Sequence, residues 1–196
     1  IRDRYKGDLI FAFDNWKDRD KIVKALKIWR HYNPKRSTKF YLFCGYMLKE
    51  NDDQRLYKDI WELFQRIKIL MQYGCFGYVM RHEDYHNHNL SNIYVQIARW
   101  CNQPQFYRYM SFWEYCYRNQ SYWEQTTLKR NVPNLKSYDE FMTDYKNGYY
   151  HGIKICKTLQ SLLDFLDKFH NQREELLEMF NYKLKELKDP NLWKRE

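Results

Sequence analysis

The sequence has little of what would build a disulfide-bonded or a membrane-spanning protein. It contains five cysteines, an odd number, and no two of them form a C-x-x-C pair. A secreted disulfide framework usually has an even number of closely spaced cysteines, so we expect reduced thiols and a cytoplasmic protein. No apolar run approaches the length of a membrane span and no signal-peptide pattern opens the chain, so we expect no membrane partner.

The sequence does have enough apolar residues for a core, together with an excess of positive charge. Hydrophobic residues make up 44% of the 196 residues, and 19 tyrosines supply most of the aromatic content. This length predicts one ordinary domain with a helical appendage. The formal net charge of +9 favours anionic partners such as nucleic acid, nucleotides or phosphates, with ordinary solubility as the alternative interpretation.

Three short apolar runs predict buried strands, at Leu9–Phe13, Lys39–Gly45 and Phe76–Met80. Apolar residues at helical spacing predict a helix after each of the first two runs, ending at Asn33 and at Gly74. Two consecutive strand–helix–strand units with short joins indicate an α/β fold with adjacent parallel strands and right-handed crossovers. We expect both crossover helices to lie on one face of this sheet.

Beyond the third strand the pattern becomes less regular. His82 to Ser91 is polar and predicts a loop, whereas Ile93 to Trp100 favours a helix. Ser111 predicts the N-cap of a short helix through Tyr117, because Glu114 completes a capping box.

The last part of the chain is predicted to be mainly helical. Residues 121–148 are polar, rich in tyrosine and poorly periodic, and predict no regular element. After them, leucines at helical spacing between Leu159 and Leu187 predict two amphipathic helices that form an antiparallel pair. We therefore expect an α/β segment over residues 1–105 and a mainly helical region over residues 106–196 that packs on it or on a partner.

Polar or small residues follow each predicted strand, and function collects at the carboxyl ends of strands in a parallel αβ barrel. Asp14 and Asn15 have the groups to hydrogen-bond a ribose or a carboxylate. Gly45 would let a ligand approach the backbone closely, and Arg81 would pair with a carboxylate or a phosphate. The alternative is that Asp14 and Asn15 cap the following helix and Gly45 only turns the chain.

The most distinctive motif is the run from Ala98 to Pro104, whose functional side chains no simple helix or strand pattern requires. Arg99 and Asn102 are its candidates for contact with a substrate or cofactor. We interpret Cys101 as a buried thiol, because free cysteines are usually buried and the sequence places no histidine partner beside it. We expect the motif to fold back over the strand ends, so that Arg99 or Asn102 shares one cleft with the residues there.

The loop after the third strand contains His82, Asp84, His86 and His88, at spacings that permit metal ligation. A metal site in a loop usually needs a fixed outer shell, and a polar loop of this kind is more often solvated. We therefore predict no metal site.

Four separate runs of residues, in a fixed order along the chain, carry a resemblance to a known family. They are Gly7 to Asn15, Lys39 to Tyr46, Arg66 to Arg81, and Ala98 to Phe106 with Ser111 to Cys116. In these runs, over roughly Tyr5 to Cys116, the chain resembles a group of bacterial and phage-type radical S-adenosylmethionine (SAM) proteins of poorly assigned substrate. The resemblance is to the second half of the barrel. It implies three strands of a (β/α)6 partial barrel followed by a C-terminal helical region.

The resemblance also implies that SAM lies across the strand ends. The side chains of Asp14 and Asn15, at the end of the fourth barrel strand, would face the sugar or the amino-acid moiety. Gly45 on the fifth strand would lie near the adenine, which the backbone at Val79 and Met80 on the sixth would also contact. The implied cofactor-binding residues are Asp14, Asn15, Gly45, Val79, Met80 and Arg81.

The chain departs from this family at its cysteines, because it lacks the C-x3-C-x2-C motif that would hold a 4Fe–4S cluster. It also begins with Ile1 rather than Met, so we expect upstream sequence. The expectation is a C-terminal part of a radical SAM enzyme that supplies the adenosine side of the SAM pocket and a C-terminal cover. The cluster is expected only with the missing N-terminal half, from the same polypeptide or a partner subunit. The implied chemistry is reductive cleavage of SAM followed by hydrogen abstraction by the 5′-deoxyadenosyl radical.

A non-catalytic basic α/β module that binds nucleic acid or a protein partner is the alternative. Tyrosine and arginine mix densely between Phe106 and Arg130, and aromatic platforms among cations are a common way to hold single-stranded nucleic acid. The chain contains no RNA-binding motif such as RNP1, so a tyrosine-rich helical cap is the other interpretation of this segment.

Overall fold

The computed structural model of the chain describes residues 9–36 and 38–194. Within these residues, three parallel strands form one open sheet in the order β1-β2-β3. The strands are β1 (Ile10–Ala12), β2 (Lys39–Cys44) and β3 (Phe76–Arg81). Helix α1 (Arg19–Tyr32) connects β1 to β2, and α2 (Asp53–Gln72) connects β2 to β3. The predicted α/β order is therefore confirmed, with strand boundaries that differ by no more than one residue.

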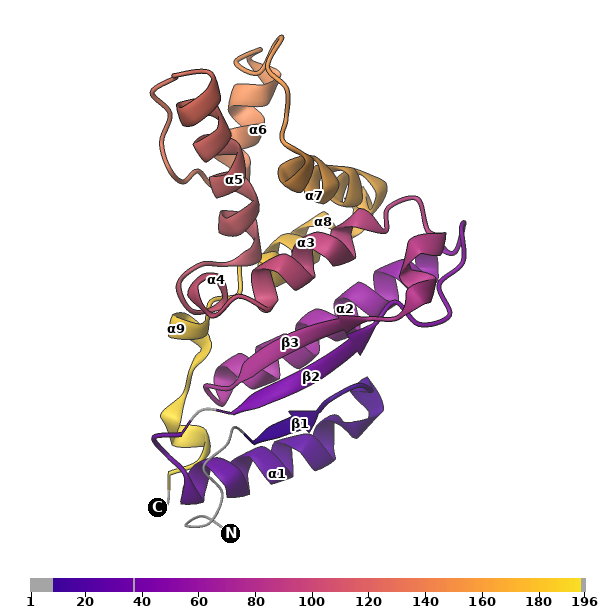
Figure 1. Ribbon diagram of the computed structural model, residues 1–196, viewed down its shortest axis with the longest axis vertical. Coiled ribbons are helices and arrows are strands. Elements are labelled where there is room, and N and C mark those ends of the chain that lie inside the picture. Colours follow the sequence, from indigo (N-terminus) through magenta and orange to yellow (C-terminus); the bar gives the residue numbers. More distant parts are fainter. Residues whose placement is uncertain (1–8, 37, 195–196) are drawn as a thin grey trace.

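The chain after β3 is mostly helical (Figure 1). Its helices are α3 (Asn92–Cys101), α4 (Pro104–Tyr109), α5 (Phe112–Thr127), α6 (Tyr138–Lys146), α7 (Lys157–Lys168), α8 (Arg173–Phe180) and α9 (Leu184–Leu187). Short 3-10 turns precede α1 at Trp16–Asp18 and α3 at Glu83–Asn87. The predicted helix over Ile93 to Trp100 is confirmed as α3.

The sheet has two unlike faces. Phe40 and Leu42 of β2 are buried on one face, against α2, and Val79 of β3 is buried beside them. Phe11 shares this face and packs edge-on against Trp29 of α1, with their ring centroids 5.7 Å apart. Both crossover helices therefore cover the same face, as predicted. Phe11 is nevertheless 40% exposed, and all three residues of β1 are exposed, so the prediction of a buried first strand is wrong: β1 lies at an edge of the sheet.

We call the opposite side of the sheet the open face. Its side chains alternate with those of the covered face because successive residues of a strand point to opposite sides. The residues of the open face are Ile10, Ala12, Lys39, Tyr41, Phe43, Phe76, Tyr78 and Met80. Most are exposed, with 37% of Tyr41 and 44% of Met80 accessible to solvent.

Helix α2 is the longest described helix, at 20 residues, and it forms the centre of the core. Its apolar stripe is buried, and its other side carries charged residues such as Lys58 and Glu62. This amphipathic pattern belongs to a helix that lies between a sheet and water. In the described part of the chain no helix is both long and apolar enough to cross a bilayer.

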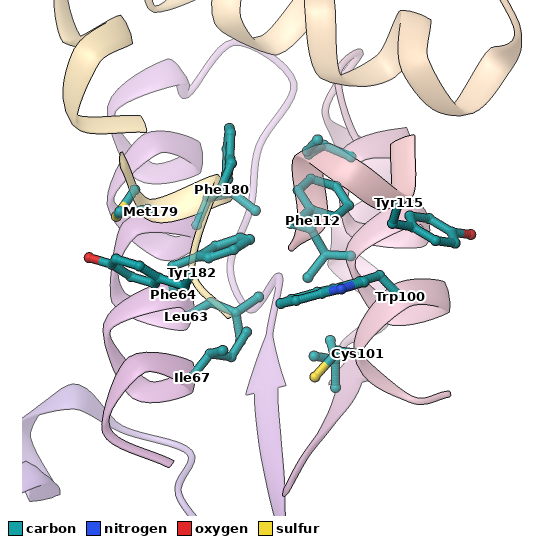
Figure 2. Packing of buried hydrophobic residues seen from close by; sticks show 14 of the residues in the cluster. Leu63, Phe64, Ile67, Trp100, Cys101, Phe112, Tyr115, Met179, Phe180 and Tyr182 are labelled. Atoms are coloured by element: carbon teal, nitrogen blue, oxygen red, sulfur yellow. The ribbon is translucent and has the colours of Figure 1, made fainter. Parts of the chain in front are cut away.

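The α/β and helical parts share one hydrophobic core, which extends from Phe13 to Trp193 in sequence. Figure 2 shows the point where they meet. Phe64 of α2 packs against Trp100 of α3, with ring centroids 6.0 Å apart, and against Phe180 of α8 at 4.9 Å. These contacts explain why the helical region docks on α2.

Several boundaries in the helical region differ from the prediction. The capping box of Ser111 and Glu114 is present, but α5 continues ten residues past Tyr117 to Thr127. Its second half buries polar side chains such as Gln120 and Glu124, which interrupt the apolar period and hide the helix in the sequence. Helix α6 also lies within residues 121–148, for which the sequence predicts no regular element.

The prediction that the second amphipathic helix continues to Leu187 without a break is wrong. Helix α8 ends at Phe180, the chain is extended at Lys183, and α9 begins at Leu184. The leucine stripe continues across the break, which explains the prediction.

Candidate functional site

The carboxyl ends of the three parallel strands meet at one rim of the sheet. At the end of β1, the Asp14 carboxylate accepts a hydrogen bond from the backbone N–H of Phe43, at 3.0 Å between Oδ1 and N. This bond continues the pairing of β1 with β2 by a side chain after the strand has ended. Asn15 follows at the surface and its side chain makes no helix-cap hydrogen bond. Helix capping therefore does not account for either residue.

Arg66 of α2 lies beneath this rim and is 2% exposed. Its Nη1 donates hydrogen bonds to three carbonyl oxygens at the ends of β1 and β2, those of Phe13 at 2.8 Å, Asp14 at 2.9 Å and Phe43 at 3.0 Å. Burial lowers the pKa of its guanidinium from the usual value. One buried cation thus fixes the ends of two strands relative to each other.

Asp59, two turns before Arg66 on α2, holds the turn after β2. Its Oδ2 accepts hydrogen bonds from the Gly45 N–H and from the Tyr94 hydroxyl, both at 2.7 Å. Gly45 has a φ of +76°, and a Cβ atom built on it would lie 2.6 Å from the Cβ of Tyr85. Glycine is required here by backbone conformation and by the close approach of Tyr85.

At the end of β3 the backbone and the side chains have different partners. The N–H of Val79 donates to Oδ1 of Asn102 at 2.7 Å, and its carbonyl accepts from Nδ2 of Asn102 at 3.0 Å. The Asn102 amide therefore pairs with the free edge of β3 as a neighbouring strand would. Met80 points to the open face, and the Arg81 guanidinium lies 4.6 Å over the ring of Tyr85.

An aromatic group at the rim was not among the predicted site residues. The His82 ring lies 5.0 Å from that of Tyr46 and 5.5 Å from that of Phe43, measured between centroids. Nδ1 of His82 is 3.1 Å from Oδ2 of Asp84, and the same carboxylate oxygen accepts a hydrogen bond from the N–H of Met47 at 2.8 Å. The signal in the sequence was position, since Tyr46 and His82 each lie within two residues of the end of a strand.

The predicted site residues do not all come together. Asp14, Asn15, Gly45, Met80 and Arg81 follow or end the strands at the rim. Helix α3 runs back along β3, so its C-terminal residues lie toward the amino ends of the strands. Asn102 there lines a groove together with Lys39 and Phe76, which begin β2 and β3. Arg99, three residues before Asn102, is exposed on α3.

The cysteines do not fit an iron–sulfur cluster. Four of the five are buried, and burial raises the pKa of each buried thiol, to about 11 for Cys75, which disfavours the thiolate that iron requires. Among the residues that the structure describes, no group of three His, Cys, Asp or Glu side chains is placed to hold a metal ion.

Comparisons of the chain with protein-family models, with curated proteins and with solved structures found no match.

Proposed function

We propose that this chain is the C-terminal part of a radical SAM enzyme, with the strand rim forming one side of the SAM pocket. The observation that carries the proposal is the sheet with one face covered by helices and the other bare and apolar. Parallel sheets normally have both faces covered, and in an αβ barrel the inner faces of the strands cover one another. Three strands of a six-stranded partial barrel would leave such a face open toward the other three.

The rim offers groups for the polar parts of SAM. One carboxylate oxygen of Asp14 is used by the Phe43 N–H, which leaves the second to accept from a ribose hydroxyl or an ammonium group. The Asn15 amide is exposed beside it, and Met80 supplies apolar surface. When bound, SAM supplies radical chemistry that begins with its reductive cleavage at a cluster. This chain's part is to bind and orient the cofactor.

The contacts of Gly45 and Val79 in the structure do not suit the adenine contacts that the resemblance implies for them. The space beside Gly45 is occupied by Tyr85, and the backbone of Val79 is occupied by Asn102. Tyr46 and Met80, adjacent to them and exposed, are the better candidates for contact with the adenine. The 4Fe–4S cluster belongs to a preceding half of the polypeptide or to a partner subunit, because the described cysteines do not fit it.

The test begins with the complete reading frame that encodes this chain. We expect a C-x3-C-x2-C motif upstream, and SAM binding by the complete protein in anaerobic isothermal titration calorimetry. Replacing Asn15 by Ala should weaken SAM binding about tenfold, which corresponds to one lost hydrogen bond of about 1.4 kcal/mol. Asn51→Ala, in an exposed turn, is the matched control. Absence of the cysteine motif together with no SAM binding would refute the proposal.

A further inference from the structure

A groove opens at the amino ends of β2 and β3, at the end of the sheet that lies opposite to the strand rim. We call it the amino-end groove, and its volume is about 230 Å³. Two cations in it lie over aromatic rings. Nζ of Lys39 is 5.7 Å from the ring centroid of Tyr78, and the Arg108 guanidinium is 4.8 Å from that of Phe76. The groove therefore combines positive charge with accessible aromatic surface.

A second groove, of about 420 Å³, lies along α5, between the end of α4 and the loop residues Asn134 and Leu135, and we call it the helical groove. Tyr109 and Tyr122 line it and are 77% and 61% exposed, far more than the tyrosines of the core. Arg118 lies on the same groove, with its guanidinium 5.7 Å from the ring centroid of Phe106. Glu114 also lines the groove, and its carboxylate is bound by Nζ of Lys183 at 2.6 Å.

Helix α4 contributes to each groove. Arg108 lines the first and Tyr109, the next residue of α4, lines the second. Figure 1 shows α4 between the end of α3 and the start of α5. The combined surface thus extends from the beginning of the sheet along α4 to the middle of α5.

The chemistry of this surface matches one class of ligand. Exposed tyrosine rings provide faces on which bases stack, and arginine and lysine side chains between them bind the phosphates that join the bases. A duplex hides its base faces, so the exposed rings favour a single strand. The net charge of +9 is complementary to a polyanion.

We propose that the amino-end groove and the helical groove together bind single-stranded nucleic acid. Bases stack on Tyr109 and Tyr122, and Lys39, Arg108 and Arg118 contact the phosphates. This surface does not include the strand rim, and Arg108, Tyr109, Arg118 and Tyr122 lie on α4 and α5, outside the sheet. Their contacts are therefore independent of SAM binding, whereas Lys39 belongs to the open face, which the proposed function covers with other strands. The proposal places a nucleic-acid ligand on the enzyme at a site other than the proposed cofactor pocket.

The test is fluorescence anisotropy with labelled oligonucleotides of about 16 nucleotides, the upper site size for binding of this type. The probes are oligo(dT), oligo(U) and a duplex of the same length. We expect both single strands to bind more tightly than the duplex, and the tighter of the two identifies the natural source as DNA or RNA. Equal or tighter binding of the duplex would contradict stacking.

Variants separate stacking from charge. Tyr109→Ala with Tyr122→Ala should weaken single-strand binding at least tenfold, whereas Tyr32→Ala, which removes a 63% exposed tyrosine on α1, should not. Arg118→Gln should reduce the slope of log affinity against log salt by about 0.7. Loss of affinity in all variants alike, or in none, would overturn the proposal. SAM titration of the same variants should be unchanged, which distinguishes this inference from the cofactor site.

Discussion

The two faces of the sheet are made by the same three strands, yet they differ in what contacts them. Leu42 and Val79 on the covered face are 0% and 3% exposed, whereas Tyr41 and Tyr78 on the open face are 37% and 38% exposed. A strand that faces water on one side normally alternates apolar with polar residues. Here both faces are apolar or aromatic, apart from Lys39 at the beginning of β2 on the open face. The open face therefore has the composition of a surface that another part of a protein covers.

The first prediction compares the faces by stability. Leu42→Ala removes a fully buried side chain packed against α2 and should lower the free energy of unfolding by about 2 to 5 kcal/mol. Tyr41→Ser, one residue away on the open face, removes the edge-on contact with Tyr78 and should cost about 1 kcal/mol or less. Urea denaturation followed by circular dichroism measures both. A loss at Tyr41 as large as that at Leu42 would show that the open face is covered in the isolated chain.

The second prediction concerns how the covered side fixes the rim. Arg66→Met retains most of the apolar length of the side chain but removes the donor to three carbonyl oxygens. We expect a loss of about 2 to 3 kcal/mol, typical of hydrogen bonds from a charged group. Lys58→Met, on the same helix with a 65% exposed side chain, should cost less than about 1 kcal/mol.

A readout at the rim makes the Arg66 prediction sharper. Since Arg66 holds the ends of β1 and β2 together, amide hydrogen exchange at Phe43 should accelerate in Arg66→Met more than exchange at Leu63 in α2. Uniform acceleration would mean that Arg66 supports global stability alone.

The sheet was predictable from sequence because its signals are local. Short apolar runs at Lys39–Gly45 and Phe76–Met80, separated by an amphipathic helix, predict parallel strands without reference to distant residues. The capping box of Ser111 and Glu114 was predictable for the same reason. The length of α5 was not, because it buries Gln120 against partners that lie more than thirty residues away, such as the backbone N–H of Cys156.

In the candidate site, too, local signals were readable from the sequence and long-range contacts were not. The position of Asp14 and Gly45 at one rim was predictable because residues after parallel strands meet there. The roles of Arg66 and Asn102 were not found, because each depends on a long-range contact with a backbone carbonyl or N–H. An arginine in the middle of an apolar stripe was the available signal for Arg66, since a buried cation needs several acceptors.

The third prediction tests the edge of the sheet at β3. Asn102→Ala removes both hydrogen bonds to the Val79 backbone and leaves that N–H and carbonyl without their partner. We expect a loss of about 1 to 2 kcal/mol. The Val79 amide should exchange faster, while that of Leu42 in the central strand should be protected as before. Unchanged exchange at Val79 would show that Asn102 does not pair with the strand in solution.

The smallest expected effect concerns the attachment of α8 to the covered side. The Tyr57 hydroxyl of α2 donates to Oε2 of Glu175 at 2.7 Å, and burial together with this carboxylate raises the pKa of Tyr57 to about 12 from the usual 10.0. A folded-state pKa above the unfolded value stabilises the protein below pH 10, and this contribution is lost as the pH rises from 10 toward 12.

Tyr57→Phe should therefore lower stability at pH 8 by less than about 1 kcal/mol, because the pair is largely solvated. It should also make the decline of stability above pH 10 shallower than in the parent, whereas Tyr32→Phe should not. Urea midpoints measured from pH 8 to pH 11 test this, and identical pH slopes in parent and Tyr57→Phe would show that the contact with Glu175 does not couple α8 to the core.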